Sequence, residues 1–222
     1  MPAATSTLTV FGLEIPPDVQ TLEGFRRWIG SLGESAPRAS FCGGRVHIEM
    51  SPQNHETHEP VANAISIALG QLAQTSDVGR YYMPPSWFTN QPTGLSTEPD
   101  GFLVSWDRLK SGAVRVNPDR KTELLGCPEK VLEVVSDTSV RKDLVEHVQD
   151  YATAGIAEYW IADARGDEID FRILTLAADG SYVPQASLAD GWLASPVWGR
   201  AFRLVRFCNP AGATDYRLDA RS

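Results

Sequence analysis

VLEVVSDTSVRKDLVEHVQDYATAGIAEYWIAD, residues 131–163, contains a strand pattern, a helix pattern and a second strand pattern in succession. Residues 131–135 form a short apolar run typical of a buried strand. Residues 140–154 predict a helix that Gly155 stops, and residues 158–162 predict the next strand. This pattern leaves one residue unexplained, the glutamate in the middle of the first apolar run.

That residue, Glu133, shares a strand face with Val131 and Val135, because alternate residues of a strand point the same way. Burying a carboxylate is costly unless it is ion-paired, hydrogen-bonded or bound to a cation. The alternative is a strand at the edge of a sheet, where Glu133 reaches solvent or a neighbouring arginine.

Outside this stretch, strands and helices continue to alternate. Apolar residues at helical spacing, bounded by Pro and Gly, predict a helix over 16–33, and a second helix-like run covers 58–73. Strands are predicted over 43–50, 101–106 and 169–176, a hairpin turn at 163–167, and a hairpin or edge strand over 192–207.

Two segments carry weaker signals. Residues 75–97 are rich in Pro, Asn, Ser and Gly and predict a loop-rich excursion with one short strand, and residues 107–126 predict a turn-rich insertion. Strands interleaved with helices indicate an α/β (α+β) fold with a mixed central sheet flanked by helices. With 222 residues and 42% hydrophobic residues, the chain predicts a single globular domain.

The cysteines and the N-terminal sequence indicate which cellular compartment to expect. Cys42, Cys127 and Cys208 are odd in number, far apart and without C-x-x-C spacing, which argues against a disulfide framework or a zinc knuckle. The first residues lack a basic region, and their apolar stretch is too short for a signal peptide or a membrane span. We therefore expect a reducing, cytoplasmic compartment.

The net charge of −8 and the pI of about 5.0 argue against a protein that holds nucleic acid by overall charge alone. Two circumstances leave DNA binding open. Clustered carboxylates that bind a divalent metal would raise the negative count, and a local basic patch is invisible in a total.

A second acid, Asp100, stands between Pro99 and Gly101 at the entrance of the strand predicted over 101–106. The alternative is a turn aspartate, since Pro-Asp-Gly is a common turn sequence. Two carboxylates on neighbouring strands can hold a divalent ion that polarises a phosphate and activates water. Asp100 and Glu133 are therefore candidate metal ligands.

These residues carry a resemblance. Pro99-Asp100, Glu133-Val134-Val135-Ser136, Asp143, Tyr151, Gly155-Ile156 and Glu158-Tyr159-Trp160-Ile161-x-Asp163 resemble, in order and spacing, the Uma-type family of putative restriction endonucleases. That family is placed in the PD-(D/E)xK nuclease superfamily. Gly44-Arg45-Val46, Met50-Ser51-Pro52 and His58 are similar to its N-terminal signature, so the resemblance covers residues 41–176. It implies a restriction-endonuclease-like domain over 41–208, between an N-terminal helical extension, 1–40, and a C-terminal tail, 209–222.

The resemblance also implies site residues. Asp100 matches the first metal-binding acid and Glu133 the second, and the carbonyl of Val134 is a further ligand in this pattern. The superfamily lysine would fall on Val135 and is absent. Many family members instead carry a lysine four residues after the aspartate that Asp143 matches, and His147 stands there.

The helix geometry then separates two candidates for the catalytic cation or base. In a regular α-helix His147 flanks the buried stripe and can face the site, whereas Lys142 lies nearly opposite and can do so only if it precedes the regular helix. The histidine could orient water or act as a base near neutral pH. The alternative is a partly solvated His147 paired with Asp143.

Each of the remaining candidates also has a structural explanation. His58 either borders the metal site or caps the helix that it opens. The Glu158-Tyr159-Trp160 run is expected to be structural. The aromatic residues of 81–88 could stack on bases, but packing onto the core is the favoured reading.

The hypothesis from sequence is a Mg²⁺- or Mn²⁺-dependent endonuclease that hydrolyses phosphodiester bonds in DNA, with Asp100 and Glu133 as ligands and His147 or Lys142 assisting. Cleavage of both strands suggests a homodimer. One alternative is a degenerate nuclease fold that binds DNA or protein without cutting, which the missing lysine and the acidic charge favour. Another is a hydrolase of smaller nucleotide substrates.

Overall fold

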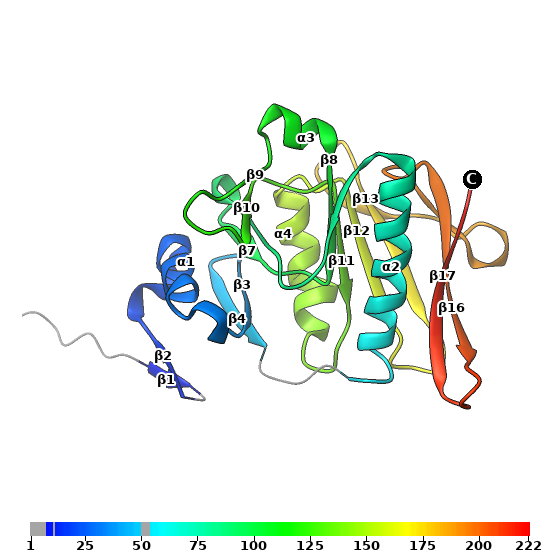
Figure 1. The fold of residues 1–222 in the computed structure, drawn as a ribbon, viewed down its shortest axis with the longest axis horizontal. Helices are drawn as coiled ribbons and strands as arrows, with labels where there is room; N and C mark the ends of the chain where they lie inside the picture. The colour runs from blue at the N-terminus through cyan, green and yellow to red at the C-terminus, as the bar shows by residue number, and fades with distance from the viewer. Residues whose placement is uncertain (1–7, 11, 50–53) are drawn as a thin grey trace, which may run out of the picture.

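The computed structural model describes residues 8–10, 12–49 and 54–222 of the chain. At its centre lies a six-stranded mixed sheet with the strand order β14-β13-β12-β11-β8-β5 (Figure 1). β11 and β12 run parallel, and the other neighbours in this sheet run antiparallel. The strands are β5 (Gly79–Tyr82), β8 (Gly101–Ser105), β11 (Lys130–Val134), β12 (Glu158–Asp163), β13 (Asp170–Leu176) and β14 (Tyr182–Pro184).

β11 is an interior strand, paired with β8 on one side and β12 on the other. Glu133 is therefore not at a sheet edge, and its exposure is only 1%. Val131 and Val135 belong to the same hydrophobic cluster on one face of the sheet, and Leu132 and Val134 to a cluster on the other. The edge-strand alternative for Glu133 is wrong, so its charge must be compensated inside the protein.

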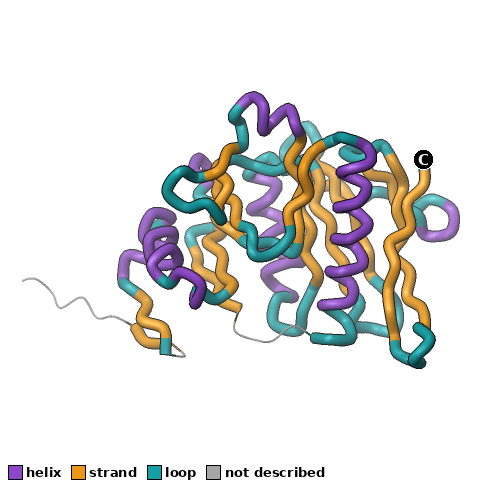
Figure 2. Tube along the Cα trace, in the orientation of Figure 1, coloured by secondary structure: helices purple, strands orange, loops and turns teal. Residues whose placement is uncertain are grey.

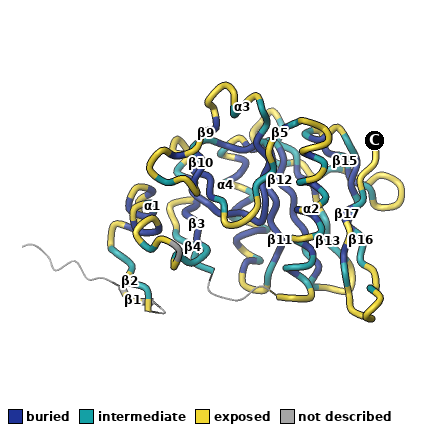
Figure 3. The backbone as a smooth tube through the Cα atoms, in the orientation of Figure 1, coloured by how far each residue is buried: buried dark blue, intermediate teal, exposed yellow. Residues whose placement is uncertain are grey.

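The two faces of the central sheet are covered differently. One face packs against α2 (Glu59–Ser76) and a three-stranded sheet of β15 (Leu193–Ser195), β16 (Arg200–Cys208) and β17 (Thr214–Arg221). The other face, which carries Glu133, packs against α4 (His147–Thr153) and a second six-stranded sheet. Figure 3 shows the buried strands enclosed between these layers.

The second sheet has the order β4-β3-β7-β6-β10-β9. Helix α1 (Leu22–Ser31) packs on it through Phe25 and Ile29, and a hydrogen-bonded ion pair joins Arg26 to Glu123 at 2.8 Å. The strands are β3 (Arg38–Cys42), β4 (Arg45–Glu49), β6 (Trp87–Asn90), β7 (Leu95–Thr97), β9 (Arg115–Val116) and β10 (Glu123–Leu125). This sheet forms one wall of the space in front of Glu133.

The long elements agree with the sequence prediction, and the short ones do not (Figure 2). An α/β (α+β) fold with a mixed central sheet is confirmed, as are the three long helices and the β12–β13 and β15–β16 hairpins. The prediction of a single short strand in 75–97 is wrong, because β5, β6 and β7 all lie there. Residues 107–126 contain β9 and β10 as well as α3 (Trp106–Ser111). These short strands pair with distant segments, which local periodicity does not reveal.

Segments on both sides of the predicted domain are built into the fold. β3 begins at Arg38, inside the predicted N-terminal extension, and pairs with β4 and β7. β17, inside the predicted C-terminal tail, pairs with β16 along its whole length. The predicted domain boundaries themselves stay a prediction. Within the described residues, no helix is long and apolar enough to cross a membrane.

The aromatic residues of 81–88 mostly pack into the core, as the favoured alternative predicted. The Tyr82 ring stacks on Phe102 with centroids 5.0 Å apart, and Phe88 meets Phe102 edge to face at 5.5 Å. Trp87 is buried beneath α1, and its indole nitrogen donates to the carbonyl of Ala39 at 3.2 Å.

Lys130, at the start of β11, is a buried amine for which no hydrogen-bond acceptor is found among the described residues. Its Nζ lies 4.0 Å from the Trp160 ring centroid and 5.3 Å from that of Tyr81. Burial lowers the pKa of Lys130 well below its ordinary value, and the charge of Glu158, its partner in register on β12, opposes this shift without cancelling it. The folded protein therefore holds the lysine proton less tightly than the unfolded chain does.

We expect Lys130→Met to raise the free energy of unfolding by about 1–3 kcal/mol at neutral pH, because it removes a buried amine that has no hydrogen-bond acceptor among the described residues. In the wild type the unfolded chain keeps the lysine proton up to a pKa of about 10.4, whereas the folded chain loses it at a lower pH. Stability therefore rises with pH between the lowered pKa and about 10.4, and this slope is smaller in the variant. Urea unfolding at neutral and mildly alkaline pH measures both effects, with exposed Lys121→Met as the control. A Lys130→Met protein less stable than the wild type would contradict the expectation.

Candidate metal centre

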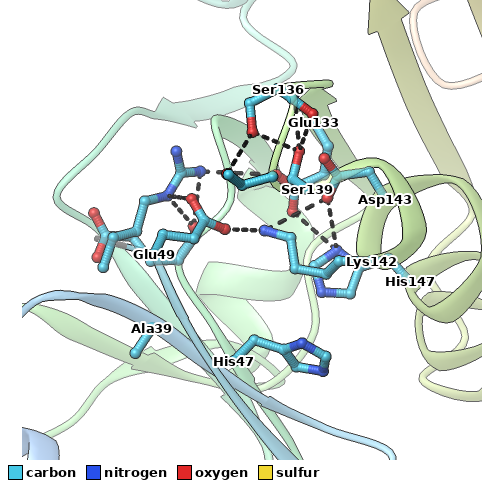
Figure 4. Close-up of polar contacts among 12 residues, drawn as sticks. Ala39, His47, Glu49, Glu133, Ser136, Ser139, Lys142, Asp143 and His147 are labelled. Carbon is cyan, nitrogen blue, oxygen red and sulfur yellow. Dashed lines mark hydrogen bonds and ion pairs between the residues drawn. The ribbon is translucent and has the colours of Figure 1, made fainter. Parts of the chain in front are cut away.

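Glu133 lies at the centre of a buried group of polar side chains (Figure 4). Its Oε1 accepts a hydrogen bond from the hydroxyl of Tyr151 at 2.6 Å and lies 3.3 Å from Nδ1 of His147. Its Oε2 lies 3.7 Å from the Arg38 guanidinium. Burial works to raise the pKa of Glu133, but Lys142 and His147 outweigh it and hold that pKa below its usual value. Glu133 is thus ionised in the interior.

The helix that faces Glu133 begins with a π turn over Lys142–Glu146, which continues into α4. The backbone N–H of His147 donates to the carbonyl of Lys142, five residues back. In a regular α-helix five residues place two side chains about 140° apart, but the wider π turn brings them onto one side. As a result Lys142, Asp143 and His147 are all buried toward Glu133.

Lys142 is the cation of this group. Its Nζ forms an ion pair with Glu49 of β4 and lies 3.5 Å from Oδ1 of Asp143. Burial works to lower the pKa of Lys142, but the charges of Glu133, Asp143 and Glu49 outweigh it and raise that pKa above its usual value. A lysine held in this way keeps its charge and acts as a counter-ion, not as a proton acceptor.

Asp143 and Glu133 form a buried pair of carboxyl groups. Burial, and then the charge of Glu133, raises the pKa of Asp143 to about 8. Oδ1 of Asp143 is 3.6 Å from Nδ1 of His147, and no described residue forms a hydrogen bond with it. One carboxyl of the pair is therefore ionised and the other protonated at neutral pH.

Asp100 lies at the entrance of β8, on the other side of Glu133 from the π turn. A Cβ on the next residue, Gly101, would stand 2.1 Å from the hydroxyl of Tyr81, so only glycine fits there. Oδ1 of Asp100 is 2.9 Å from Arg38, and Oδ2 accepts from the backbone N–H of Val134 at 2.6 Å. Burial opposes ionisation, but Arg38 and His58 outweigh it and hold the pKa of Asp100 well below its usual range.

His58 stands at the N-cap position of α2, where its side chain makes no capping hydrogen bond, and is buried with Nε2 3.5 Å from Oδ2 of Asp100. Burial works to lower the pKa of His58, but the hydrogen bond and the charge of Asp100 outweigh it and raise that pKa. Of the two alternatives considered from sequence, the side chain thus borders the acidic cluster and does not cap the helix.

Arg38, on β3, joins the two acids. Its guanidinium contacts Asp100 and Glu133, lies 3.6 Å from Glu49, and donates to the carbonyl of Glu98 at 3.1 Å. Sequence reasoning missed this residue, because nothing in the pattern around it distinguishes it from a surface arginine. Arg38 is far from Asp100 in sequence, and the pairing of β3 with β7 brings the two residues together.

Three side chains meet the requirements of a metal site. One ligand atom each from Glu133, Asp143 and His147 can be chosen so that all lie within 4.8 Å of one another. Oδ1 of Asp143 and Nδ1 of His147 are buried without a hydrogen-bond partner among the described residues. The carboxyl groups around the cluster, Glu49, Glu98, Asp100, Glu133 and Asp143, outnumber its permanent cations, Arg38 and Lys142. Because burial keeps Asp143 protonated at neutral pH, a divalent cation bound there would displace its proton.

The second nitrogen of His147 faces a thiol. Its Nε2 lies 3.4 Å from Sγ of Cys42, which is buried at the end of β3. Burial raises the pKa of Cys42, so the group stays a thiol rather than a thiolate. If Nδ1 is to bind a metal, Nε2 must carry the proton and donate it to this sulfur. In that tautomer Cys42 accepts a hydrogen bond from His147 and positions its ring.

We expect Cys42→Ala to weaken divalent-metal binding about 10- to 100-fold, the range for losing an outer partner of a metal-binding histidine. Calorimetric titration with Mn²⁺ measures this effect. Cys127→Ala is the matched control, because Cys127 is also a buried thiol but contacts Ala154 instead of the acidic cluster. Equal affinities in the two variants would show that Cys42 does not position the histidine.

The predicted site residues meet at one place. Asp100, Glu133, Lys142 and His147 surround the same buried cluster, with His58 at its border. Lys142 faces the cluster under the condition that the helix geometry set, because it lies in the π turn that precedes the regular helix α4. The partly solvated alternative for His147 is wrong, since its exposure is 0%. Glu49, one of the predicted outward residues of the 43–50 strand, was not recognised as part of the cluster.

Comparison with known proteins identifies the family and the fold of the chain. A family model named Uma2, with the description "Putative restriction endonuclease", matches residues 22–201. The crystal structure of a putative nuclease belonging to DUF820 from Anabaena variabilis matches with a TM-score of 0.59 at 14% sequence identity, over 81% of this chain and 90% of that one. No curated protein matches the chain. Of the sequence signature, Met50-Ser51-Pro52 lies outside the described residues.

Proposed function

The chain belongs to the Uma2 family, and we propose that it is a divalent-metal-dependent endonuclease that hydrolyses phosphodiester bonds in DNA. The observation that carries the proposal is the convergence of Glu133, Asp143 and His147, with two of their atoms buried and without a hydrogen bond among the described residues. A purely structural cluster would be expected to satisfy such atoms.

In this proposal Glu133, Asp143 and His147 hold the cation. A bound divalent cation would supply Lewis acidity and lower the pKa of an attacking water. Two carboxylates suit both Mg²⁺ and Mn²⁺, but an imidazole ligand favours the transition metal. Of the two ions expected from sequence, Mn²⁺ is therefore the one we propose to bind more tightly.

Lys142 takes the place of the missing superfamily lysine. The π turn carries its charge to the acidic cluster, where a lysine at Val135 would otherwise contribute it. We propose that Lys142 and Arg38 contact the phosphate of the DNA that is cut. Their fixed charges can neutralise the negative charge that develops on the phosphate oxygens. This argument weakens the degenerate-site alternative, because the cation that the sequence pattern lacks is present in three dimensions.

Asp100 and His58 act through Arg38 in this proposal. Both oxygens of Asp100 already have partners in Arg38 and in the N–H of Val134. Asp100 therefore orients the guanidinium and ties β8 to β11. The sequence-based expectation that Asp100 is itself a metal ligand stays a prediction.

The partner is proposed to be DNA, which the family description implies. Cleavage of both strands requires two such centres, so a two-fold homodimer is the assembly that we propose. The centre supplies fixed cations where phosphate would lie, which reconciles DNA binding with the net charge of −8.

We expect Glu133→Gln to weaken Mn²⁺ binding more than about 100-fold, because a ligand should matter at least as much as an outer partner. Plasmid cleavage should be lost in parallel. Glu123→Gln is the control, since Glu123 is a buried carboxylate paired with Arg26 outside the cluster. Metal binding without cleavage in the wild type would favour the degenerate fold, and no metal binding at all would overturn the metal centre.

Asp100→Asn separates the two roles assigned to this residue. As a positioning group for Arg38, its loss should reduce cleavage while leaving Mn²⁺ affinity within about threefold of the wild type. Calorimetry and cleavage on the same protein measure both quantities. A fall in affinity as large as that of Glu133→Gln would instead identify Asp100 as a ligand.

A further inference from the structure

Beside the acidic cluster lies a pocket that the proposed chemistry does not use. It has a volume of about 600 Å³ and lies between α1, the second sheet and the loop before β10. We call it the α1 pocket. Its lining includes Gly30, Ala36, Arg38, Trp87, Glu98 and Arg120.

Arg38 belongs to both the α1 pocket and the acidic cluster. The same guanidinium that lines the pocket lies 2.9 Å from Asp100, and it donates to the carbonyl of Glu98. A ligand in the pocket is thus separated from the acidic cluster by a single side chain. If a phosphate is held at Arg38, the group attached to that phosphate can enter the pocket.

The pocket offers the surfaces that a nucleobase needs. The Arg120 guanidinium lies over the ring of the buried Trp87, 4.3 Å from its centroid, so Trp87 supports the guanidinium and the guanidinium is the surface offered to a base. Aromatic rings and guanidinium planes are surfaces on which bases stack. Glu98 and Thr122 add polar groups that can hydrogen-bond a base edge. The volume falls in the range of small-molecule sites.

A base within a duplex cannot reach a recessed pocket of this kind without leaving the stack. Arg38 and Arg120 complement the charge of a nucleic-acid strand. Stacking on a planar group does not depend on which base is present. Both features fit an unpaired base better than a paired one.

We propose that the α1 pocket receives one unpaired nucleobase next to the phosphate that is cut. The proposal rests on the nuclease function above and narrows its substrate class to single-stranded DNA or to DNA with an unpaired nucleotide at the cleavage position. Arg38 then links recognition to chemistry, since it contacts the base pocket and both Asp100 and Glu133.

Gly30→Leu tests this assignment, because it narrows the pocket without removing any charged group. A Cβ on Gly30 meets no atom within 4 Å, and leucine is a better helix former than glycine. Gly70→Leu is the matched control. Gly70 lies in α2, has the same free space around its Cβ and does not line the pocket.

The first measurement is titration of each protein with the four deoxynucleosides, followed by NMR. These probes carry no phosphate, so the result is independent of metal binding. The wild type and Gly70→Leu should bind at least one nucleoside, and Gly30→Leu should bind it at least about tenfold more weakly, the effect of losing one stacked base. Equal binding in all three proteins, or no binding by the wild type, would overturn the assignment.

The second measurement is cleavage of an oligonucleotide, single-stranded and fully paired, with Mn²⁺ present. The wild type should prefer the single strand about tenfold or more, and Gly30→Leu should lose this preference while its Mn²⁺ affinity stays unchanged. Equal cleavage of both substrates by the wild type would overturn the substrate class and leave the nuclease function standing. A fourth outcome separates the two proposals. If the wild type binds a nucleoside but cuts neither substrate, and Gly30→Leu blocks that binding, the base pocket is supported and the nuclease function is overturned.

Discussion

The carboxylate of Glu133, buried in an interior strand, is the constraint on which the arrangement around it depends. A charge in this position is tolerated only if its surroundings supply compensating charges and hydrogen bonds. Tyr151 donates a hydrogen bond to Glu133, and His147 and Arg38 lie beside its carboxylate. The positive charge of Lys142 also favours the ionised form of Glu133. These groups come from two separate parts of the chain, so the helix and the second sheet must both be in place beside β11 before the charge is neutralised.

The π turn determines which side chains can serve Glu133. A regular α-helix would direct either Lys142 or His147 toward the sheet, but not both. With the wider turn, both side chains and Asp143 face the same way, and the hydroxyl of Tyr159 bonds the carbonyl of Asp143 at 2.9 Å. Local widening of a helix is frequent at functional sites. Here it gathers a cation, a carboxyl group and an imidazole within one helical turn.

Arg38 gives the N-terminal part of the chain a role in the centre. It lies on β3, and β3 is held in place by its pairing with β4 and β7 and by α1, which packs behind it. The same guanidinium borders the α1 pocket and the two acids of the central sheet. A change in how α1 packs would therefore reach the acidic cluster through one side chain. This coupling explains why residues that precede the predicted domain belong to the same functional unit.

The sequence by itself determined the long elements, the mixed sheet and the two acids at Asp100 and Glu133. Hydrophobic periodicity and the position of a charge within an apolar run are local properties, so they can be read without a structure. The tertiary structure alone decided that Arg38, Glu49 and Cys42 reach the cluster, since each depends on strand pairing between distant segments. It also decided that Lys142 faces inward, because the π turn departs from the periodicity that sequence reasoning must assume. Only the folded chain shows which charges compensate one another, because burial and distance set their energies and neither is a property of the sequence order.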